Sequence, residues 1–411
     1  MNLEKELGEI NLHWHGEKMA VWKYRREVFE KIWKDRGVKL MALITGMRRI
    51  GKSVVCKQLV DGLVVDGVEP QQILFWEFRP GDTQKELIAV WQYYYDYVAN
   101  LREKVYVFFD EIQYVDDYEI VLKNWYDRYE QVKFFLTGSF SLLSKPKTRD
   151  SLAGRYWDYR LMPLSFKEYL EMSGRGWPII DGDDKWKLEG MAREFNHDFR
   201  KFLRYGRFPE TLSMTEDQTR EYARATKIQM VSRDVPDYFE VRRLGLLINI
   251  FEYITENSGG EISGRSLAQK LGENQLTVNK YLEVLSIMGL VYLVANTTNP
   301  LKVGNMNRKA YASSALTEGK EADNLGTLVE SYVLERLLTA GKKVTYYRWR
   351  NQEIDFLVPK ERLAVEVKYR WEGIGTDRYR QIADKLGYKL LFLTLDRASV
   401  DDVEALPVCW F

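Results

Sequence analysis

Residues 46–53, Gly-Met-Arg-Arg-Ile-Gly-Lys-Ser, have the types and spacing of a phosphate-binding loop. They fit the pattern G-x-x-x-x-G-K-[ST], with an apolar run before them and a helical pattern after them. In such a loop, backbone N–H groups and the helix dipole favour bound phosphate. Lys52 would reach the β- and γ-phosphates of ATP, and the Ser53 hydroxyl would ligate Mg²⁺. A tight glycine turn without a ligand is the alternative. The expected nucleotide contacts are Gly46, Met47, Arg48, Arg49, Ile50, Gly51, Lys52, Ser53 and Val54.

Two carboxylates and a hydroxyl follow two further apolar runs. Asp110 and Glu111 come directly after residues 106–109, and Thr137-Gly-Ser139 ends the next run. Ligands of open α/β sheets bind at the carboxyl ends of the strands. We therefore expect Asp110 to hold Mg²⁺ through water and Glu111 to orient or deprotonate the attacking water. The hydroxyl of Thr137 or Ser139 would sense the γ-phosphate, or the serine would cap a helix.

A cation on the γ-phosphate is the remaining requirement of ATP hydrolysis, since an arginine finger raises the rate by about 10³- to 10⁵-fold. Two candidate arginines, Arg48 and Arg49, lie inside the loop. Two more, Arg149 and Arg155, follow the apolar run that ends at Ser139. Because Gly154-Arg155 leads into another apolar run, Arg155 is the favoured finger, acting within its own chain or on a neighbour. A salt bridge at the start of a strand is the alternative.

The elements that would position these residues alternate along the chain. Such alternation is typical of a parallel sheet covered by helices on both faces. Ser165 and Glu168 have capping-box spacing for a helix after Pro163. A helix is also expected over residues 17–37. The predicted strands are 40–45, 73–78, 105–109, 132–137 and 156–161, and the helices between them are 52–65, 83–102 and 118–129.

Composition excludes several classes of protein. The chain has 411 residues, of which 45% are hydrophobic and 29% charged, as in ordinary globular proteins. The formal net charge of +1 confines nucleic-acid contacts to a local patch. Two distant cysteines and no long apolar run favour the cytoplasm and argue against a membrane span. Of the three histidines, His13 and His15 could form a metal clip, but a solvated N-terminal arm is favoured.

Residues 241–315 have the pattern of a winged helix-turn-helix. A helix is expected at 243–257, a second within 266–271 and a recognition helix at 277–288, followed by strands at 290–295 and 309–312. Asn274, Gln275, Asn279 and Lys280 would be exposed on the recognition helix, and Lys302, Arg308 and Lys309 would touch DNA phosphates from the wing. Because this region carries little charge, a scaffold for interdomain or protein contacts is an equal alternative.

The last part of the chain places carboxylates together. If Lys360-Glu361 is the turn between strands at 353–358 and 363–369, Asp355 faces Glu366. A divalent metal, Mg²⁺ or Mn²⁺, would relieve the repulsion between the two. Lys368 lies on the same face as Glu366, and Glu330 points inward from a helix at 325–340. An active metal nuclease, an inactive nuclease fold and exposed hairpin charges all remain open.

With these residues, the chain resembles archaeal and bacterial AAA-like ATPases of the additional-strand P-loop class. That group combines a helical lid, a winged helix and a restriction-nuclease-like PD-(D/E)XK domain. The resemblance implies a sheet in the order 5-1-4-3-2, and Arg207 departs from it where a second glycine is expected. The matching residues are Gly46-Met-Arg-Arg-Ile-Gly-Lys-Ser53, Phe109-Asp-Glu-Ile-Gln113, Leu136-Thr-Gly-Ser139, Leu152-Ala-Gly-Arg155, Pro163-Leu-Ser-Phe-Lys-Glu-Tyr-Leu170, Tyr205-Gly-Arg-Phe-Pro-Glu210, Gly326, Glu330, Asp355 and Glu366-Val-Lys368.

These patterns together predict an α/β protein with five parts. They are an N-terminal helical arm (1–38), a P-loop core (39–162), a helical lid (163–240), a winged helix (241–315) and a nuclease-like domain (316–411). We expect Mg-ATP hydrolysis coupled to DNA binding or processing. The alternative is an ATP-driven switch that recruits a protein partner and carries an inactive nuclease fold. A small-molecule kinase fits poorly, and the pattern leaves the oligomeric state open.

Overall fold

The computed structural model describes residues 3–143, 151–178, 185–297, 307–317, 325–369, 375–400 and 403–411. Two compact units make up the chain, Met1–Met162 and Pro163–Phe411. Within the described residues, no helix combines the length and the apolar character that a membrane span requires.

The first unit is built on a five-stranded parallel sheet in the order β2-β3-β4-β1-β5. Read from the other edge, this is the order implied by the resemblance. The additional strand β4 lies between β1, which leads into the loop, and β3, which ends in the carboxylates. The strands are β1 (Met41–Gly46), β2 (Ile73–Glu77), β3 (Val105–Asp110), β4 (Val132–Gly138) and β5 (Tyr156–Leu161).

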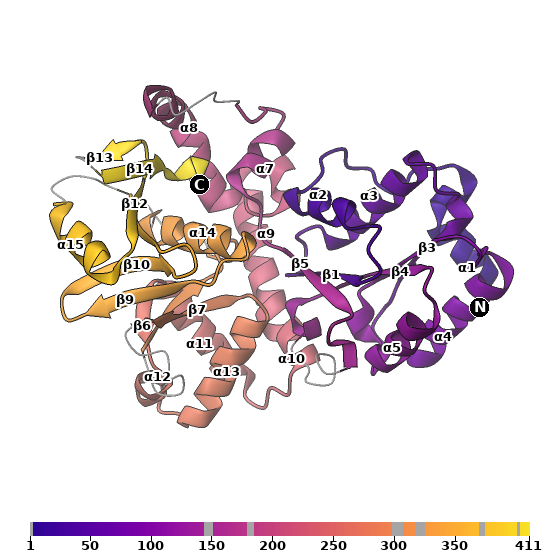
Figure 1. Cartoon of the computed structure of the whole chain (residues 1–411). Coiled ribbons are helices and arrows are strands. Elements are labelled where there is room, and N and C mark those ends of the chain that lie inside the picture. The colour runs from indigo at the N-terminus through magenta and orange to yellow at the C-terminus, as the bar shows by residue number, and fades with distance from the viewer. Residues whose placement is uncertain are drawn as a thin grey trace. The chain divides into compact units, whose positions relative to one another are not determined.

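Helices cover both faces of this sheet. Figure 1 shows α2 (Glu27–Lys34) and α3 (Lys52–Val65) on one face, with α4 (Gln84–Tyr97) and α5 (Tyr118–Arg128) on the other. The three central strands are buried at every residue: β1, β3 and β4. This explains why its strands read as continuous apolar runs rather than as alternating patterns.

The helix expected over residues 17–37 is wrong in its first half, because only Glu27–Lys34 are helical. The preceding backbone is held by side chains of α3 instead. The carboxylate of Asp61 accepts hydrogen bonds from the N–H groups of Met19 and Ala20 at 2.8 and 2.9 Å. These tertiary bonds satisfy backbone groups that a helix would otherwise have to pair.

The N-terminal segment is likewise not a solvated arm. His13 is buried, and its Nε2 lies 3.0 Å from the carbonyl oxygen of Ile73. The Asn11 side chain accepts a hydrogen bond from the N–H of Phe75 at 2.7 Å. Both contacts fall on β2, which is the edge strand of the sheet. The segment containing α1 (Leu3–Ile10) and η1 (Leu12–His15) therefore covers an edge that would otherwise expose unpaired backbone groups.

The second unit contains one nine-stranded sheet in the order β13-β14-β12-β11-β10-β9-β7-β8-β6. β7 pairs in parallel with β9, so the boundary expected at 315/316 runs through one continuous sheet. The strands are β6 (Gly260–Ile262), β7 (Val291–Asn296), β8 (Arg308–Ala312), β9 (Thr345–Trp349), β10 (Gln352–Val358), β11 (Leu363–Lys368), β12 (Lys389–Thr394), β13 (Ser399–Val400) and β14 (Val403–Pro407).

The helices of this unit include the capped helix that the sequence predicted. Ser165 and Glu168 form the expected capping box at the start of α7. The helices are α7 (Phe166–Met172), α8 (Lys185–Tyr205), α9 (Glu216–Gln229), α10 (Val235–Tyr238), α11 (Leu244–Glu256), α12 (Gly264–Leu271), α13 (Gln275–Ile287), α14 (Leu325–Thr339) and α15 (Asp377–Leu386).

Arg207 is a buried member of a polar network. Its guanidinium pairs with Glu335 of α14, donates to the carbonyl of Leu164 and donates to the Ser314 hydroxyl at 2.9 Å. Glu335 accepts further hydrogen bonds from the N–H of Ser314 and the hydroxyl of Ser313 at 3.0 and 2.9 Å. The side chain that replaces the expected glycine thus connects the segment after Pro163 to α14.

Removing Arg207 should destabilise the second unit strongly. Arg207→Ala leaves the Glu335 carboxylate buried without its cation, which typically costs about 3–5 kcal/mol. Denaturant unfolding of this variant is expected to begin at a markedly lower concentration than in the parent. The exposed Arg242→Ala is the matched control, and equal unfolding of the two variants would contradict a stabilising role for the network.

Candidate nucleotide site and C-terminal carboxylate cluster

The loop between β1 and α3 begins and ends at glycines whose geometry other residues would disturb. A Cβ on Gly46 would lie 2.5 Å from the carbonyl oxygen of Leu161, so β5 approaches too closely for any side chain there. Gly51 caps α3 with a φ of 95°, in the left-handed region that glycine adopts without strain. The first helical residue is Lys52, so the loop has the strand before it and the helix after it that the sequence predicted.

Lys52 lies beside both the loop and the carboxylates. Its side chain is buried, and its Nζ donates to the carbonyl of Met47 at 3.1 Å. The same ammonium lies 3.4 Å from Oε1 of Glu111. The two residues meet because β1 and β3, with β4 between them, end at the same edge of the sheet.

Thr137 joins the two acidic residues by one hydroxyl. It donates to Oδ1 of Asp110 and accepts a hydrogen bond from the N–H of Glu111 at 2.9 Å. Thr137 therefore holds the end of β3 against the end of β4. Ser139 lies just beyond, where its carbonyl accepts from the N–H of Leu142 and starts a short turn.

The second oxygen of Asp110 fits a metal-binding role. Asp110 is fully buried, and its Oδ2 makes no hydrogen bond within the part of the chain that the structure describes. Burial, followed by the charge of Glu111, raises the pKa of Asp110 to about 6, and the hydroxyls of Ser53 and Thr137 oppose this rise. A buried carboxylate with an unused lone pair beside a serine hydroxyl suits a hard cation such as Mg²⁺.

Two further residues position this site and were not predicted for it. Gln113 donates its amide N–H to Oε2 of Glu111, which itself has a left-handed φ of 53°. Arg26 is buried and donates from its two terminal nitrogens to the carbonyls of Ile50 and Met162, each at 2.7 Å. It fastens the loop to the end of β5. Little in the sequence indicates this role for Arg26, because the residue is one of several basic residues in the same segment.

Arg155 does not reach the phosphate site of its own chain, so that form of the prediction is wrong. β5 pairs in parallel with β1, and Arg155 precedes β5 at the edge opposite the loop. The six residues of β5 place it roughly 20 Å away, at about 3.3 Å per residue. Its guanidinium instead binds Asp127 through bonds of 2.9 and 3.0 Å. Action on a neighbouring chain stays a prediction. Arg149 lies outside the described residues.

In the second unit, the predicted carboxylates do come together. Phe356 pairs with Val365, and this register places Asp355 and Glu366 on adjacent strands as expected. Oε2 of Glu366 accepts from the N–H of Asp355, and Oδ2 of Asp355 accepts from the N–H of Val367, both at 3.1 Å. Oε1 of Glu366 pairs with Lys368.

Glu330 is close enough to this pair for the charge of Asp355 to act on it, and the hydroxyl of Tyr311 donates to its Oε2 at 3.2 Å. Burial first, and then the charge of Asp355, raises the pKa of both Glu330 and Glu366.

Lys309 enters this cluster, so its predicted contact with DNA phosphate is wrong. Its buried ammonium lies 3.1 Å from Oδ1 of Asp355 and 2.5 Å from Oε1 of Glu353. Both oxygens of Asp355 and both oxygens of Glu366 then have donors from the protein. The described residues include no group of three metal-ligating side chains. A second divalent metal does not fit this arrangement. Lys309 lies two residues before the buried Tyr311 on the same strand, so the alternation of side chains along a strand would have predicted that it points inward.

The expected DNA-contacting helix is α13, and its polar residues differ in accessibility. Asn274 is exposed and caps the helix by accepting from the N–H of Leu276 at 2.8 Å. Lys280 is exposed, with its Nζ 3.2 Å from the carbonyl oxygen of Glu240. Asn279 is only partly exposed and lies against Gly264. Lys302 lies outside the described residues.

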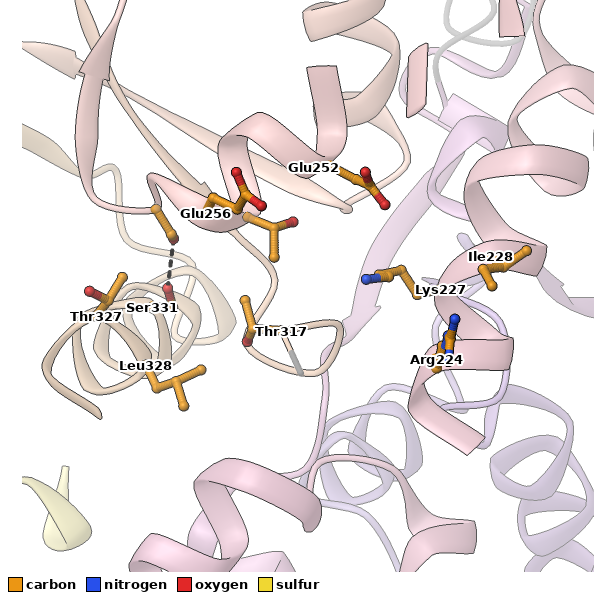
Figure 2. Close-up of a pocket in the computed structure, with 11 residues that line it drawn as sticks. Arg224, Lys227, Ile228, Glu252, Glu256, Thr317, Thr327, Leu328 and Ser331 are labelled. Carbon is orange, nitrogen blue, oxygen red and sulfur yellow. Dashed lines mark hydrogen bonds between the residues drawn. The ribbon is translucent and has the colours of Figure 1, made fainter. Parts of the chain in front are cut away.

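A cavity of about 770 Å³ lies between α9 on one side and α11 and α14 on the other (Figure 2). Arg224 and Lys227 project from α9, whereas Glu252 and Glu256 belong to α11. An anion in this cavity would therefore be repelled by the two glutamates, and a cation by Arg224 and Lys227. None of the predicted site residues lines this cavity.

The sheet order and the loop geometry define the first unit as a P-loop α/β domain. Residues 39–170 match the family model of an AAA domain, and residues 196–313 match that of a domain of unknown function (DUF8612). An uncharacterized protein of Haemophilus influenzae is 23% identical over 410 residues, covering 93% of this chain and 97% of that one. One of Methanocaldococcus jannaschii is 24% identical over 415 residues, covering 91% and 88%. The Walker-type ATPase of Pyrococcus abyssi aligns with a TM-score of 0.44 and 18% identity over 72% of this chain and 95% of that one.

Arg26→Ala should weaken ATP binding by about tenfold or more, because charge-assisted hydrogen bonds contribute roughly 1.5–3 kcal/mol each. The carbonyl of Ile50 loses its donor, and the loop loses its tie to β5. ATP titration of the purified chain measures the effect. The neighbouring exposed residue provides the control, Arg25→Ala. Equal affinities for the two variants would show that Arg26 does not position the loop.

The raised pKa of Glu366 predicts that stability falls as pH rises above the ordinary glutamate range. The folded protein holds a proton that the unfolded chain releases, so the free energy of unfolding decreases with pH in this window. Thermal unfolding midpoints at pH 5 to 9 test this. Glu366→Gln, which cannot titrate, should flatten the profile. An unchanged slope in this variant would contradict the raised pKa.

Proposed function

We propose that the chain binds Mg-ATP at residues 46–53 and hydrolyses it, and that the nucleotide state acts on DNA binding by the second unit. One observation carries the catalytic part: Lys52, Asp110, Glu111 and Thr137 converge at one sheet edge, beside a loop whose shape depends on glycine. The AAA-domain match over residues 39–170 supports the same assignment.

In this proposal each residue of the site would have a separate role in hydrolysis. The Lys52 ammonium is shared between Met47 and Glu111, and bound phosphate would draw it from Glu111. Glu111, oriented by Gln113, would then accept a hydrogen bond from the water that attacks the γ-phosphorus. The bond to the bridging oxygen breaks, and ADP and phosphate leave. Ser53 and Asp110 would hold Mg²⁺, which neutralises charge on the phosphates.

Coupling to the second unit is supported by the junction between the two units. Arg26 binds the carbonyl of Met162 on one side of Pro163, together with that of Ile50 in the loop. Arg207 binds the carbonyl of Leu164 on the other side and also pairs with Glu335 of α14. A movement of the loop would therefore act on a segment that both arginines hold.

The order of elements from α11 to β8 supports DNA binding. Three helices and three strands follow one another as in a winged helix, and α12 packs against α13. Arg265, in the first turn of α12, is exposed and makes no ion pair with the described residues. Affinity would come from a few such cations, since the chain has a formal net charge of only +1.

A second candidate is a switch whose C-terminal fold cuts nothing. Lys309 favours it, because this lysine neutralises Asp355 where a nuclease would place a metal. ATP would then order the units and recruit a protein partner.

Lys52→Ala should abolish ATP turnover, and Glu111→Gln should slow it by about 10²-fold or more while ATP still binds. Phosphate release under saturating Mg-ATP measures both effects. Lys57→Ala, on the same helix, is the control. Turnover retained in Lys52→Ala would overturn the assignment of the loop.

The same assay with DNA separates the two candidates. Stimulation by DNA, with an affinity that falls steeply with salt, supports coupling. No binding at low salt would leave the switch as the function. Manganese-dependent DNA cutting that Asp355→Ala abolishes would contradict an inactive nuclease fold.

A further inference from the structure

The hairpin of β9 and β10 ends in an exposed basic and aromatic tip. Trp349 pairs with Gln352, so Arg350 and Asn351 alone make the turn. Trp349 is 54% exposed, and Arg350 is also exposed. Arg350 has a φ of 55°, a conformation that favours glycine and that costs another residue about 1 kcal/mol or more. The turn thus carries an arginine where glycine would be the less strained choice.

This tip lies at the same edge of the sheet as the end of β7 and the start of β8. Ala295, near the end of β7, pairs in parallel with Thr345 at the start of β9. It also pairs with Arg308 at the start of β8. β9 continues beyond β7 for several residues, which carries Trp349 past the end of its neighbour. Figure 1 shows β9 and β10 as adjacent orange strands next to β7.

The charge at this edge favours a polyanion. Arg350 forms no ion pair with any residue that the structure describes. Arg348 is shared between Glu261 and Glu353 at 3.7 and 3.6 Å and remains 45% exposed. Glu353 is also paired with Lys309. Glu261 and Glu353 therefore both have basic partners, and Arg308 and Arg350, which pair with no carboxylate among the described residues, add positive charge.

We propose that this hairpin tip binds single-stranded nucleic acid, with Trp349 stacking on a base and Arg350 contacting the adjacent phosphate. The inference rests on the proposed nucleic-acid binding of the second unit and adds the surface and the form of the ligand. An exposed indole can stack on a base only when the face of that base is free. Paired and stacked bases of a duplex withhold that face, so the tip selects single strands, ends or opened duplex.

Fluorescence anisotropy with a labelled single-stranded oligonucleotide and its duplex tests the proposal on the full chain. Trp349→Ala should weaken single-strand binding by about tenfold or more, since stacking contributes about 1–3 kcal/mol per base. Trp349→Phe should restore part of the loss. Arg350→Ala should weaken binding and reduce the salt dependence by about 0.7 in the log–log slope, the value for one phosphate on a single strand.

The matched control is Trp186→Ala, because Trp186 is 85% exposed and lies in the first turn of α8. Parent-like ATP turnover and thermal unfolding establish that each variant is folded. If the parent binds no nucleic acid at low salt, the proposed function itself fails. If the parent binds but Trp349→Ala and Arg350→Ala bind equally well, the proposed function stands and the tip does not bind nucleic acid.

Discussion

The carboxylate of Asp110 is buried at the end of β3, and the first unit is arranged around the requirement that it have partners. One oxygen is held by Thr137 on the adjacent β4, which also fixes the N–H of Glu111. The other oxygen has no hydrogen bond in the described chain. Because a buried charge without a partner is costly, the site favours a bound cation or a bound proton. Its raised pKa is the expression of that constraint.

The sequence was sufficient wherever local pattern and chain topology decide the structure. The loop at 46–53 and the carboxylates at 110–111 follow from residue spacing, and parallel pairing brings them to one edge. The hairpin register that joins Asp355 to Glu366 follows from a single assumed turn, which the pairing of Val358 with Leu363 bears out. Ser165 and Glu168 formed the expected cap because the capping box is a local interaction.

Tertiary contacts between distant segments determined the structural features that the sequence did not predict. The backbone at Met19 and Ala20 avoids a helix because Asp61 binds it, and His13 is buried because the N-terminal segment covers the edge of β2. Arg155 lies at the end of β5 that is farther from the loop. Predicting this position requires knowing that β5 pairs in parallel with β1. No pattern in the sequence identifies Arg26 as the residue that holds the loop.

The carboxylate cluster of the second unit contrasts with the site in the first. At Asp110 the described residues supply no donor to one oxygen, whereas at Asp355 they supply Lys309 and a backbone N–H. We therefore propose that an aspartate binds a metal in the first unit, whereas the chain itself neutralises an aspartate in the second. This difference favours nucleotide chemistry in the first unit and a binding or scaffolding role for the second.

Binding of ATP with and without Mg²⁺ tests the central claim, that the free oxygen of Asp110 belongs to a magnesium-nucleotide site. Calorimetric titration of the parent should show tighter ATP binding with Mg²⁺ than with a chelator present. Asp110→Asn should still bind ATP through the loop but lose most of that difference. If the variant retains the full effect of Mg²⁺, Asp110 is not part of the metal site and the account of this edge of the sheet is wrong.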